Sequence, residues 1–391
     1  MILIHLCYDV PNKSKGRDTV KLRFVLAPDS FKGTLDALQI CDIQEKIILA
    51  QIPDAEVKLL PMSDGGEGMV NSYHRMMGGD LIDAAVSGPL GEKVSAAYLM
   101  LSDRTAVIEM SSAAGLPMVE GREDPFNTTT FGVGELLLDA KRRGAKAILL
   151  GIGGSCTNDC GIGIASALGY RFFDHAGSEV APLAKNLSAI ASIAAPDATF
   201  GIPLRVACDV DNPLLGENGA TRTFGPQKGA SPQTVEILES GMAQFARILS
   251  AYCGIPDLAS IPGAGAAGGM GAACMAFWGG KLVPGAELLL ETAQFDLMLQ
   301  NTDYVFTGEG RIDWQSAHGK VIGTIAAHCK TAGVPCIALC GSIGNKAEEL
   351  YDCGVSAIFS TTPAPRTFEE VKCTAAHDLA QLTDAVVRLI R

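Results

Sequence analysis

An alternation of apolar strands and helices near the start of the chain is the feature that most restricts its fold. The run Arg23–Pro28 predicts a strand, a helical pattern covers Leu35–Gln51, and Glu56–Met62 predicts a second strand. A further helix follows to about Met77. Two strands joined by a helix pair in parallel, and helices then cover the sheet. These residues therefore predict an α/β fold built on a parallel sheet.

Both of these strands end in a polar loop. Asp29 and Lys32 follow the first strand, and the sequence SDGGEG follows the second. Open α/β sheets bind ligands at the carboxyl ends of their strands, so two such loops predict a ligand site. Taken singly, each acid would serve equally well as a helix cap. The candidate contacts to substrate or phosphate in the second loop are Asp64, Gly65, Gly66 and Glu67.

The pattern changes in the middle of the chain and returns near its end. Three β-rich runs (residues 81–87, 94–101 and 104–110) predict antiparallel or mixed strands. After residue 302, strands and helices alternate again, up to a long closing helix, Phe368–Ile390. We therefore expect a flavodoxin/Rossmann-like parallel-sheet domain split between residues 22–78 and 286–391. A mixed α/β domain, residues 79–285, would be inserted into it, and residues 1–21 would be an N-terminal tail.

Composition excludes several classes of protein. The formal net charge of -12 argues against a nucleic-acid or anionic-membrane partner, because both require a basic face. No run of 18 apolar residues predicts a membrane span. The 12 cysteines lack zinc-site spacing, and we expect reduced core thiols in a cytoplasmic protein. The N-terminal apolar run precedes the basic run, which is the wrong order for a secretory signal.

A glycine-rich stretch, GIGGSCTNDCGIG (151–163), lies between a predicted strand, Ala145–Leu150, and a short helix, Ile164–Leu168. Glycine lets backbone N–H groups approach a ligand, and the helix N-terminus favours an anion. The same residues also suit a tight turn with a helix cap. From the residues of this stretch alone, both interpretations stay open. The candidate ligand contacts here are Gly154, Ser155, Asn158 and Asp159.

The run Arg205–Val210 predicts a buried strand that ends in acids. Asp209 and Asp211 are two residues apart, and this spacing places both carboxylates on one face, where they would hold Mg²⁺ or orient a hydroxyl. Asn212 follows them as a candidate substrate contact. The next loop, 216–229, contains Arg222 and Lys228, for which a surface position is the preferred interpretation.

Residues 263–268 match the pattern G-x-G-x-x-G, but they do not support a dinucleotide site. Ile261 and Pro262 precede the glycines instead of a strand, and no suitably spaced acid follows. The run reads as a helix of small residues, at which Gly268 and Gly269 remain candidates for phosphate contact. No Walker A sequence occurs in the chain.

Loop 307–320, after a predicted strand Thr302–Thr307, has the richest chemistry of the chain. It combines acids, cations and glycine N–H groups at a strand end, which fits phosphoryl transfer with Mg²⁺ bridging nucleotide phosphates. A lone histidine in it, His318, is more often structural than a base. The candidate site residues of this loop are Glu309, Arg311, Asp313 and Lys320.

The chain resembles the bacterial glycerate kinase family in motifs that follow one another from about Leu22 to the C-terminus. In order they are APDSFKGT, PMSDGGEG, IGIGGSCTNDCGIG, RVACDVDNPLLGENGATRTFGPQKGA, PGAGAAGGMGAA and TGEGRIDWQSAHGKV. The resemblance implies an ATP- and Mg²⁺-dependent kinase of D-glycerate, usually giving 2-phosphoglycerate, with a cleft between two α/β domains. Cys156 and Cys160 stand where the family commonly has Ala and Gly, and Trp314 replaces a small polar residue.

The resemblance and the residues together suggest roles. Lys32, Arg311 and Lys320 are candidates for binding the glycerate carboxylate and the transferred phosphoryl group. Asp209 and Asp313 are candidates for base and metal ligand, in either order. Further metal or hydroxyl contacts are expected from Asp64, Glu67 and Glu309, and substrate or phosphate contacts from Ser155, Asn158 and the glycine amides.

Other functions stay open at this point. The chain is expected to act as a monomer or a homodimer. Phosphorylation at the 3-hydroxyl, a non-catalytic sugar-acid-binding protein, and an oxidoreductase that uses residues 263–268 are the alternatives.

Overall fold

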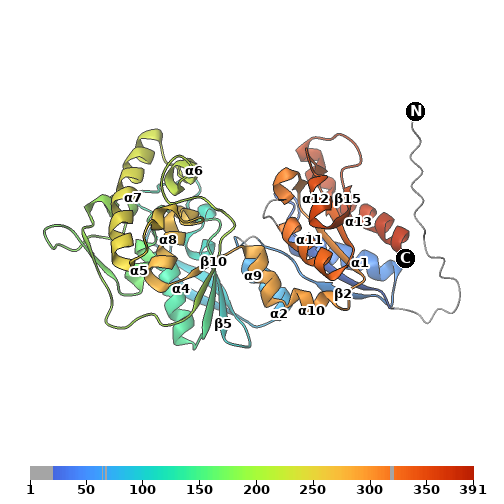
Figure 1. Cartoon of the computed structure of the whole chain (residues 1–391), viewed down its shortest axis with the longest axis horizontal. Coiled ribbons are helices and arrows are strands. Elements are labelled where there is room, and N and C mark those ends of the chain that lie inside the picture. Colours follow the sequence, from blue (N-terminus) through green and yellow to red (C-terminus); the bar gives the residue numbers. More distant parts are fainter. Residues whose placement is uncertain (1–20, 64, 67, 318–320) are drawn as a thin grey trace.

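Two sheets form the two lobes of the protein (Figure 1). The computed structural model describes residues 21–63, 65–66, 68–317 and 321–391. The predicted α/β class with parallel strands is confirmed. None of the helices in these residues is long and apolar enough to cross a membrane.

The first sheet is entirely parallel and has the strand order β15-β13-β11-β1-β2. If the five strands of this sheet are numbered 1 to 5 in their order along the chain, their order across the sheet is 2-1-3-4-5, as in flavodoxin. Its register places Phe24 beside Tyr304 and Leu26 beside Phe306. The strands are β1 (Arg23–Pro28), β2 (Glu56–Leu59), β11 (Tyr304–Gly308), β13 (Cys336–Cys340) and β15 (Val355–Ser360).

Alternate side chains of the first sheet face opposite layers of helices, as the two-residue repeat of a strand requires. Phe24 and Leu26 belong to a core shared with helices α1 (Ala37–Gln51) and α13 (Phe368–Ile390). Val25 and Ala27 face the other layer, which includes α11 (Val321–Ala332) and α12 (Glu349–Cys353). Both faces are therefore covered, which explains the continuous apolar runs.

The second sheet is mixed, with the order β10-β9-β6-β5-β4-β3. Four strands are parallel, and β3 and β4 add an antiparallel edge. The strands are β3 (Asp80–Ser87), β4 (Lys93–Met100), β5 (Thr105–Glu109), β6 (Ala147–Gly151), β9 (Leu204–Ala207) and β10 (Lys281–Val283). The helices of its outer layer are α4 (Phe131–Arg142), α5 (Ile162–Ala167), α7 (Pro232–Cys253) and α8 (Ala266–Trp278).

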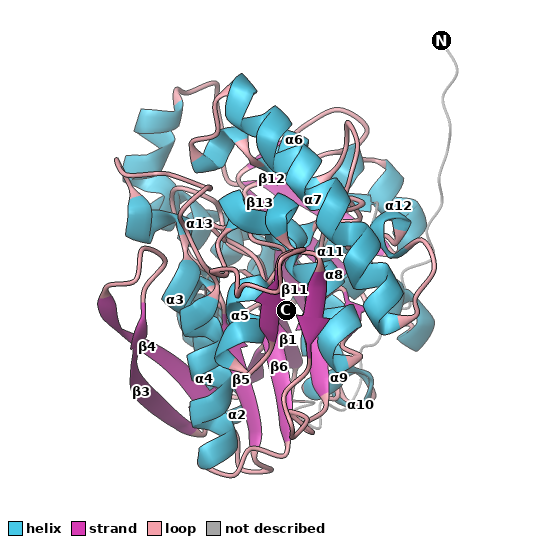
Figure 2. Ribbon diagram, turned by 90° about the vertical axis from the view of Figure 1, so that its left-hand side faces the viewer, coloured by secondary structure: helices cyan, strands magenta, loops and turns pink. Residues whose placement is uncertain are grey.

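Helices α2 (Met69–Met77) and α9 (Gly285–Thr292) lie between the two lobes (Figure 1). Figure 2, turned by 90°, shows the helices arranged around the strands. Met69, Val70 and Tyr73 of α2 share one apolar core with β4, β5 and residues of the first sheet. Helix α2, expected to cover the sheet of the split domain, therefore packs on the second sheet. The remaining short elements are α3 (Ser111–Ala114), α6 (Ala220–Phe224), α10 (Phe295–Leu299), β7 (Arg171–Phe173), β8 (Ser192–Ala194), β12 (Arg311–Ile312) and β14 (Ser342–Ile343).

Several element boundaries differ from the prediction by a few residues. The strand predicted for Arg205–Val210 ends at Ala207, so Asp209 and Asp211 lie in the loop that follows β9. The helix expected to begin at Leu35 begins at Ala37.

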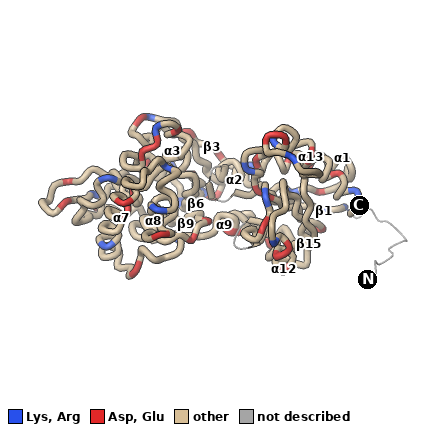
Figure 3. The backbone as a smooth tube through the Cα atoms, turned by 90° about the horizontal axis from the view of Figure 1, so that it is seen from above, with Lys and Arg blue, Asp and Glu red and all other residues tan. Residues whose placement is uncertain are grey.

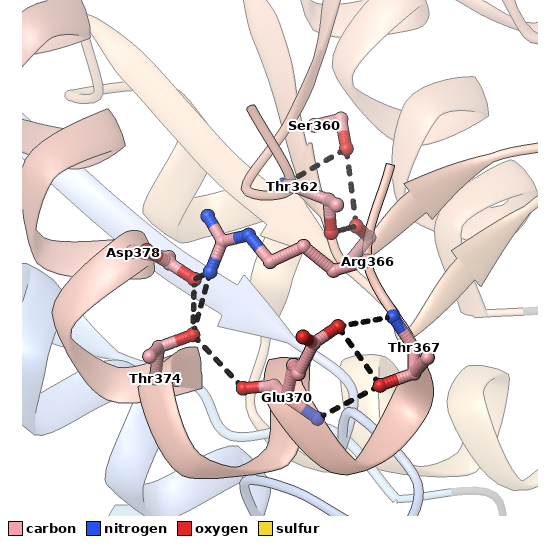
Figure 4. Close-up of polar contacts among 8 residues, drawn as sticks. Ser360, Thr362, Arg366, Thr367, Glu370, Thr374 and Asp378 are labelled. Carbon is pink, nitrogen blue, oxygen red and sulfur yellow. Dashed lines mark hydrogen bonds and ion pairs between the residues drawn. The ribbon is translucent and has the colours of Figure 1, made fainter. Parts of the chain in front are cut away.

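Asp378 of helix α13 faces the interior of the protein and not the solvent. Arg366 donates to Asp378 at 2.9 Å and to Thr374 at 2.8 Å, and Asp378 is buried (Figure 4). Thr367 caps α13 through a reciprocal pair of hydrogen bonds with Glu370. This network fastens the segment between β15 and α13 to the first turns of α13, as Figure 4 shows.

Replacing Leu26 tests the contribution of the first sheet's core. Leu26 is 0% exposed in β1, whereas Leu389 at the end of α13 is 76% exposed. We expect Leu26→Ala to lower the free energy of unfolding by about 2–5 kcal/mol, because it removes buried methyl groups and leaves a cavity. Leu389→Ala, the matched control, should change it by less than about 0.5 kcal/mol. Equal urea midpoints for the two variants would contradict this packing.

Candidate functional site

Two cavities meet at the carboxyl ends of the strands. One, of about 850 Å³, is named here the lysine cavity after Lys228; the other, of about 1000 Å³, is the apolar cavity. They share the loop after β1 and the loop after β9. Parallel sheets of the 2-1-3-4-5 order bind ligands at the strand ends beside their switch point, here between β1 and β11. The shared lining residues are Asp29, Ser30, Lys32, Asp209 and Val210.

The lysine cavity is lined from both lobes. Gly66, Ser63 and Asn71 come from the region around the loop after β2, and Gly154 and Ser155 come from the glycine-rich stretch after β6. These positions place the predicted residues Gly66, Gly154 and Ser155 at a cavity wall. Gly65 lies next to them but does not line the cavity.

Lys228 was expected at the surface, but the structure buries it. Its side chain is 2% exposed, and its Nζ donates to Ser155 Oγ at 2.9 Å and to the carbonyl oxygen of Thr157 at 2.7 Å. Burial lowers the pKa of Lys228 to about 8, while Cys156 and Asp159 act in the opposite direction. Arg222, from the same loop, instead forms an ion pair with the exposed Glu236.

Asp159, a predicted ligand contact, lines neither cavity. Its side chain is 0% exposed, and it accepts hydrogen bonds from the N–H groups of Thr130, Gly161 and Gly163 and from the Thr130 hydroxyl. Burial raises the pKa of Asp159, and these donors oppose that rise. The carboxylate therefore organises the start of α5 from inside.

Asn158, Gly268 and Gly269 also pack inside the protein and do not line a cavity. Asn158 donates to Thr221 Oγ1 at 3.0 Å. A Cβ on Gly268 would lie 2.1 Å from the carbonyl oxygen of Thr157, so glycine is required by close backbone packing. In this structure the three residues make packing contacts, and Asn158 Oδ1 is buried without a hydrogen-bond partner among the described residues.

Cys160 has a left-handed backbone, with φ of 49°. This region favours glycine, the residue that the glycerate kinase resemblance leads us to expect at this position. The thiols of Cys156 and Cys160 are both buried, and burial raises the pKa of Cys156 to about 12. These departures from the family pattern therefore lie beneath the cavity wall and add no reactive thiolate to it.

The apolar cavity lies between the loop after β11 and α13. Glu309, Arg311 and Trp314 line it. Glu309 accepts a hydrogen bond from the hydroxyl of Ser316. The apolar part of its wall consists of Phe31, Val321, Phe368, Val371 and Ala375.

Asp313 and Asn212 line neither cavity, so the structure does not bring them to the site. Asp313 accepts from the Gln315 N–H at 3.0 Å and lies 3.5 Å from Arg311. Asn212 donates to the carbonyl oxygen of Asn218 at 2.7 Å. Both side chains are thus engaged within their own loops. Asp64, Glu67, Lys320 and His318 lie outside the described residues.

Asp209 lies where the cavities meet. Its Oδ1 accepts a hydrogen bond of 2.7 Å from the N–H of Gly285, at the start of α9. This bond orients the carboxylate between the two cavities, although Asp209 is not on a strand. Asp209 and Lys32 are therefore the predicted residues that the structure places most centrally.

No group of three or more His, Cys, Asp or Glu side chains with metal-site geometry occurs among the described residues. Mg²⁺ at kinase sites is commonly held by one or two carboxylates together with substrate phosphates and water. Asp29 and Asp209 line both cavities and Glu309 lines one, so the carboxylates present fit such a site.

Sequence reasoning missed several charged residues that line the cavities, among them Glu109 and Lys228. Glu109, at the end of β5, lines the lysine cavity and accepts from the N–H of Val70 at 2.5 Å. Its position at a strand end could have identified it, because polar residues at other strand ends were interpreted as candidate ligand contacts. Lys228 gave no such indication, because its burial depends on residues 155–157, about seventy positions away.

The acidic and basic residues are interspersed along both lobes in Figure 3. Lys228 and Asp159, in the second lobe, differ from these residues because both side chains are buried. Their buried positions are consequences of local packing around the glycine-rich stretch.

Asp159→Asn tests the structural role of this carboxylate. An amide turns one acceptor into a donor that faces backbone N–H groups, so we expect a loss of about 1–3 kcal/mol in the free energy of unfolding. Asp197→Asn, at an exposed position, is the control and should be neutral. A variant at Asp159 that is as stable as the control but binds substrate poorly would show that the side chain contacts ligand instead.

Comparison with known proteins identifies the relatives of the chain. The model of the glycerate kinase family matches residues 24–391. Glycerate kinase of Halalkalibacterium halodurans is 44% identical over 354 residues, 88% of this chain and 92% of that protein. Glycerate 2-kinase of Escherichia coli K12 is 40% identical, over 89% and 93%.

A solved structure agrees with these relatives. The crystal structure of putative glycerate kinase 2 from Salmonella typhimurium LT2 superposes with a TM-score of 0.83 and 37% identity, covering 95% of this chain and 98% of that one. The chain therefore belongs to the glycerate kinase family, and it is a kinase.

Proposed function

We propose that the protein transfers the γ-phosphoryl group of ATP to a hydroxyl of D-glycerate and gives 2-phospho-D-glycerate. The observation that carries this proposal is the meeting of two cavities at Asp29, Lys32 and Asp209. A kinase requires two substrates to approach each other at charged groups that position and neutralise phosphate. The name of the Escherichia coli relative, glycerate 2-kinase, supports the choice of hydroxyl.

The apolar cavity suits the nucleotide. Aliphatic and aromatic side chains, among them Val371 and Phe368, line it away from the charged edge. A nucleobase binds to such a wall, and its phosphates would then extend toward Lys32 and Asp209. The lysine cavity, with its polar wall, is left for the small hydroxy acid.

Asp209 is proposed as the base that accepts the proton of the attacking hydroxyl, because the Gly285 N–H fixes its orientation at the junction. Lys32 would neutralise charge on the transferred phosphoryl group. Asp29 and Glu309 would hold Mg²⁺, which supplies further neutralisation of the nucleotide phosphates.

The eleven described cysteines are free thiols, which supports a reducing compartment such as the cytoplasm.

Asp209→Asn tests the assignment of the base. The amide still accepts the Gly285 hydrogen bond but cannot take a proton, so we expect the turnover number to fall by about 100-fold or more. Asp211→Asn is the matched control, because Asp211 is exposed in the same loop and lines neither cavity. The measurement is ADP formation from ATP, Mg²⁺ and D-glycerate, with the product identified by phosphorus NMR. Near-normal turnover of a folded Asp209 variant would remove it from the chemistry.

Tryptophan fluorescence tests where the nucleotide binds. The chain has two tryptophans, and Trp314 lines the apolar cavity while Trp278 packs against Tyr170 and Phe277. In a Trp278→Phe variant, ATP should change the emission of Trp314, and D-glycerate alone should leave it nearly unchanged. The reciprocal Trp314→Phe variant should lose the response to ATP while retaining kinase activity. An equal response to ATP from Trp278 would place the nucleotide elsewhere.

A further inference from the structure

Lys228 is a buried cation without a carboxylate partner in the described part of the chain. Its two hydrogen bonds go to neutral oxygens, those of the Ser155 hydroxyl and the Thr157 carbonyl. No described Asp or Glu forms an ion pair with it, and the nearby Asp159 is occupied by its own donors. Burying an ammonium group without a countercharge is costly, so a ligand anion would gain by completing its environment.

The position of Lys228 makes it accessible to a ligand in spite of its burial. Its side chain forms part of the wall of the lysine cavity. An ammonium group has three N–H donors, and two of them are used by Ser155 and Thr157. The third donor has no hydrogen-bond partner among the described residues, and Lys228 lines the cavity that an anion would enter.

Other groups of the same cavity match a small hydroxy acid. Ser63 Oγ is buried, and no described residue forms a hydrogen bond with it. Gly153 and Gly154 form the neighbouring wall without side chains, so a ligand can approach the backbone. One ammonium group with hydroxyls around it fits a carboxylate monoanion.

We propose that Lys228, held by Ser155, binds the carboxylate of the substrate and makes the enzyme select a hydroxy acid over a neutral polyol. This inference rests on the proposed function. In this proposal Lys228, and not Arg311, binds the carboxylate. The side chain of Arg311 is 68% exposed, and Arg311 lines the apolar cavity. Lys32, at the junction, keeps its role toward the phosphoryl group.

Substitution of Lys228 provides the first test. With D-glycerate, Lys228→Met should lower kcat/KM by about 100-fold or more, mainly through KM, because a buried charge pair is lost. With the neutral analogue D-glyceramide, kcat/KM should change only a few-fold, so the preference for the acid collapses. Lys146→Met is the control, since Lys146 is exposed at the amino end of β6, opposite the cavity. Its kinetics should equal those of the unmodified enzyme.

Two results would overturn the proposal. Equal losses for D-glycerate and D-glyceramide would place Lys228 in phosphoryl transfer or in folding, and unchanged selectivity would remove it from substrate binding. Circular dichroism and the melting temperature of each variant show whether it is folded. If the unmodified enzyme forms no ADP with D-glycerate, the proposed function itself fails, which is a distinguishable outcome.

A pH titration of the unmodified enzyme tests the proposal without a substitution. Charged groups around Lys228 are Asp159 and the thiol of Cys156, and the same cavity is lined by Asp29, Lys32, Asp36, Glu109 and Asp209. The carboxylate needs the ammonium form, which the free enzyme loses as the pH rises through the lysine's pKa of about 8. The KM for D-glycerate should therefore rise roughly tenfold per pH unit above that pKa, until the pKa of the complex is reached. The KM for D-glyceramide should stay flat, and a parallel rise for both would contradict the proposal.

Discussion

The close approach of two backbone loops holds the site together. The N–H of Gly153, after β6, donates to the carbonyl oxygen of Gly65, after β2, at 3.2 Å. A Cβ on Gly151 would lie 2.4 Å from the same oxygen, so a side chain there would force the loops apart. Because the loops come from different sheets, their contact makes residues of both lobes walls of one cavity. The glycines therefore allow two chain segments to pack closely, in addition to allowing a ligand to approach the backbone.

The polar residues of the glycine-rich stretch divide between the interior and the cavity. Asp159 binds backbone N–H groups from two segments and so fixes the start of α5 relative to Thr130. Ser155 lies at the cavity and contacts Lys228. One short stretch therefore contains both a structural carboxylate and a wall of the site. Its sequence left open both a ligand contact and a turn with a helix cap. In the structure, Ser155 lies at the cavity, whereas Asp159 organises the turn and the start of the helix.

Most of the fold could be predicted because its elements are encoded locally. The strand predicted for Arg23–Pro28 has those bounds in the structure, and so has the helix Phe368–Ile390. Continuous apolar runs and helical periodicity come from neighbouring residues, which the sequence shows directly. A site was predicted at the ends of strands, and Lys32, Asp209, Ser155 and Glu309 line the cavities near these ends. Asp313 lines neither cavity, because its carboxylate accepts a hydrogen bond from the Gln315 N–H within its own loop.

The sequence by itself determined the alternation of strands and helices, the polar loops at strand ends and the motifs that mark the family. Only the tertiary structure decided which polar side chains face a cavity. Arg222 and Lys228 are six residues apart in one glycine-rich loop, yet Arg222 pairs with Glu236 at the surface and Lys228 is buried against Ser155. Burial depends on the segments that pack around a residue, and those segments lie far away along the chain. A local sequence pattern contains no information about such neighbours.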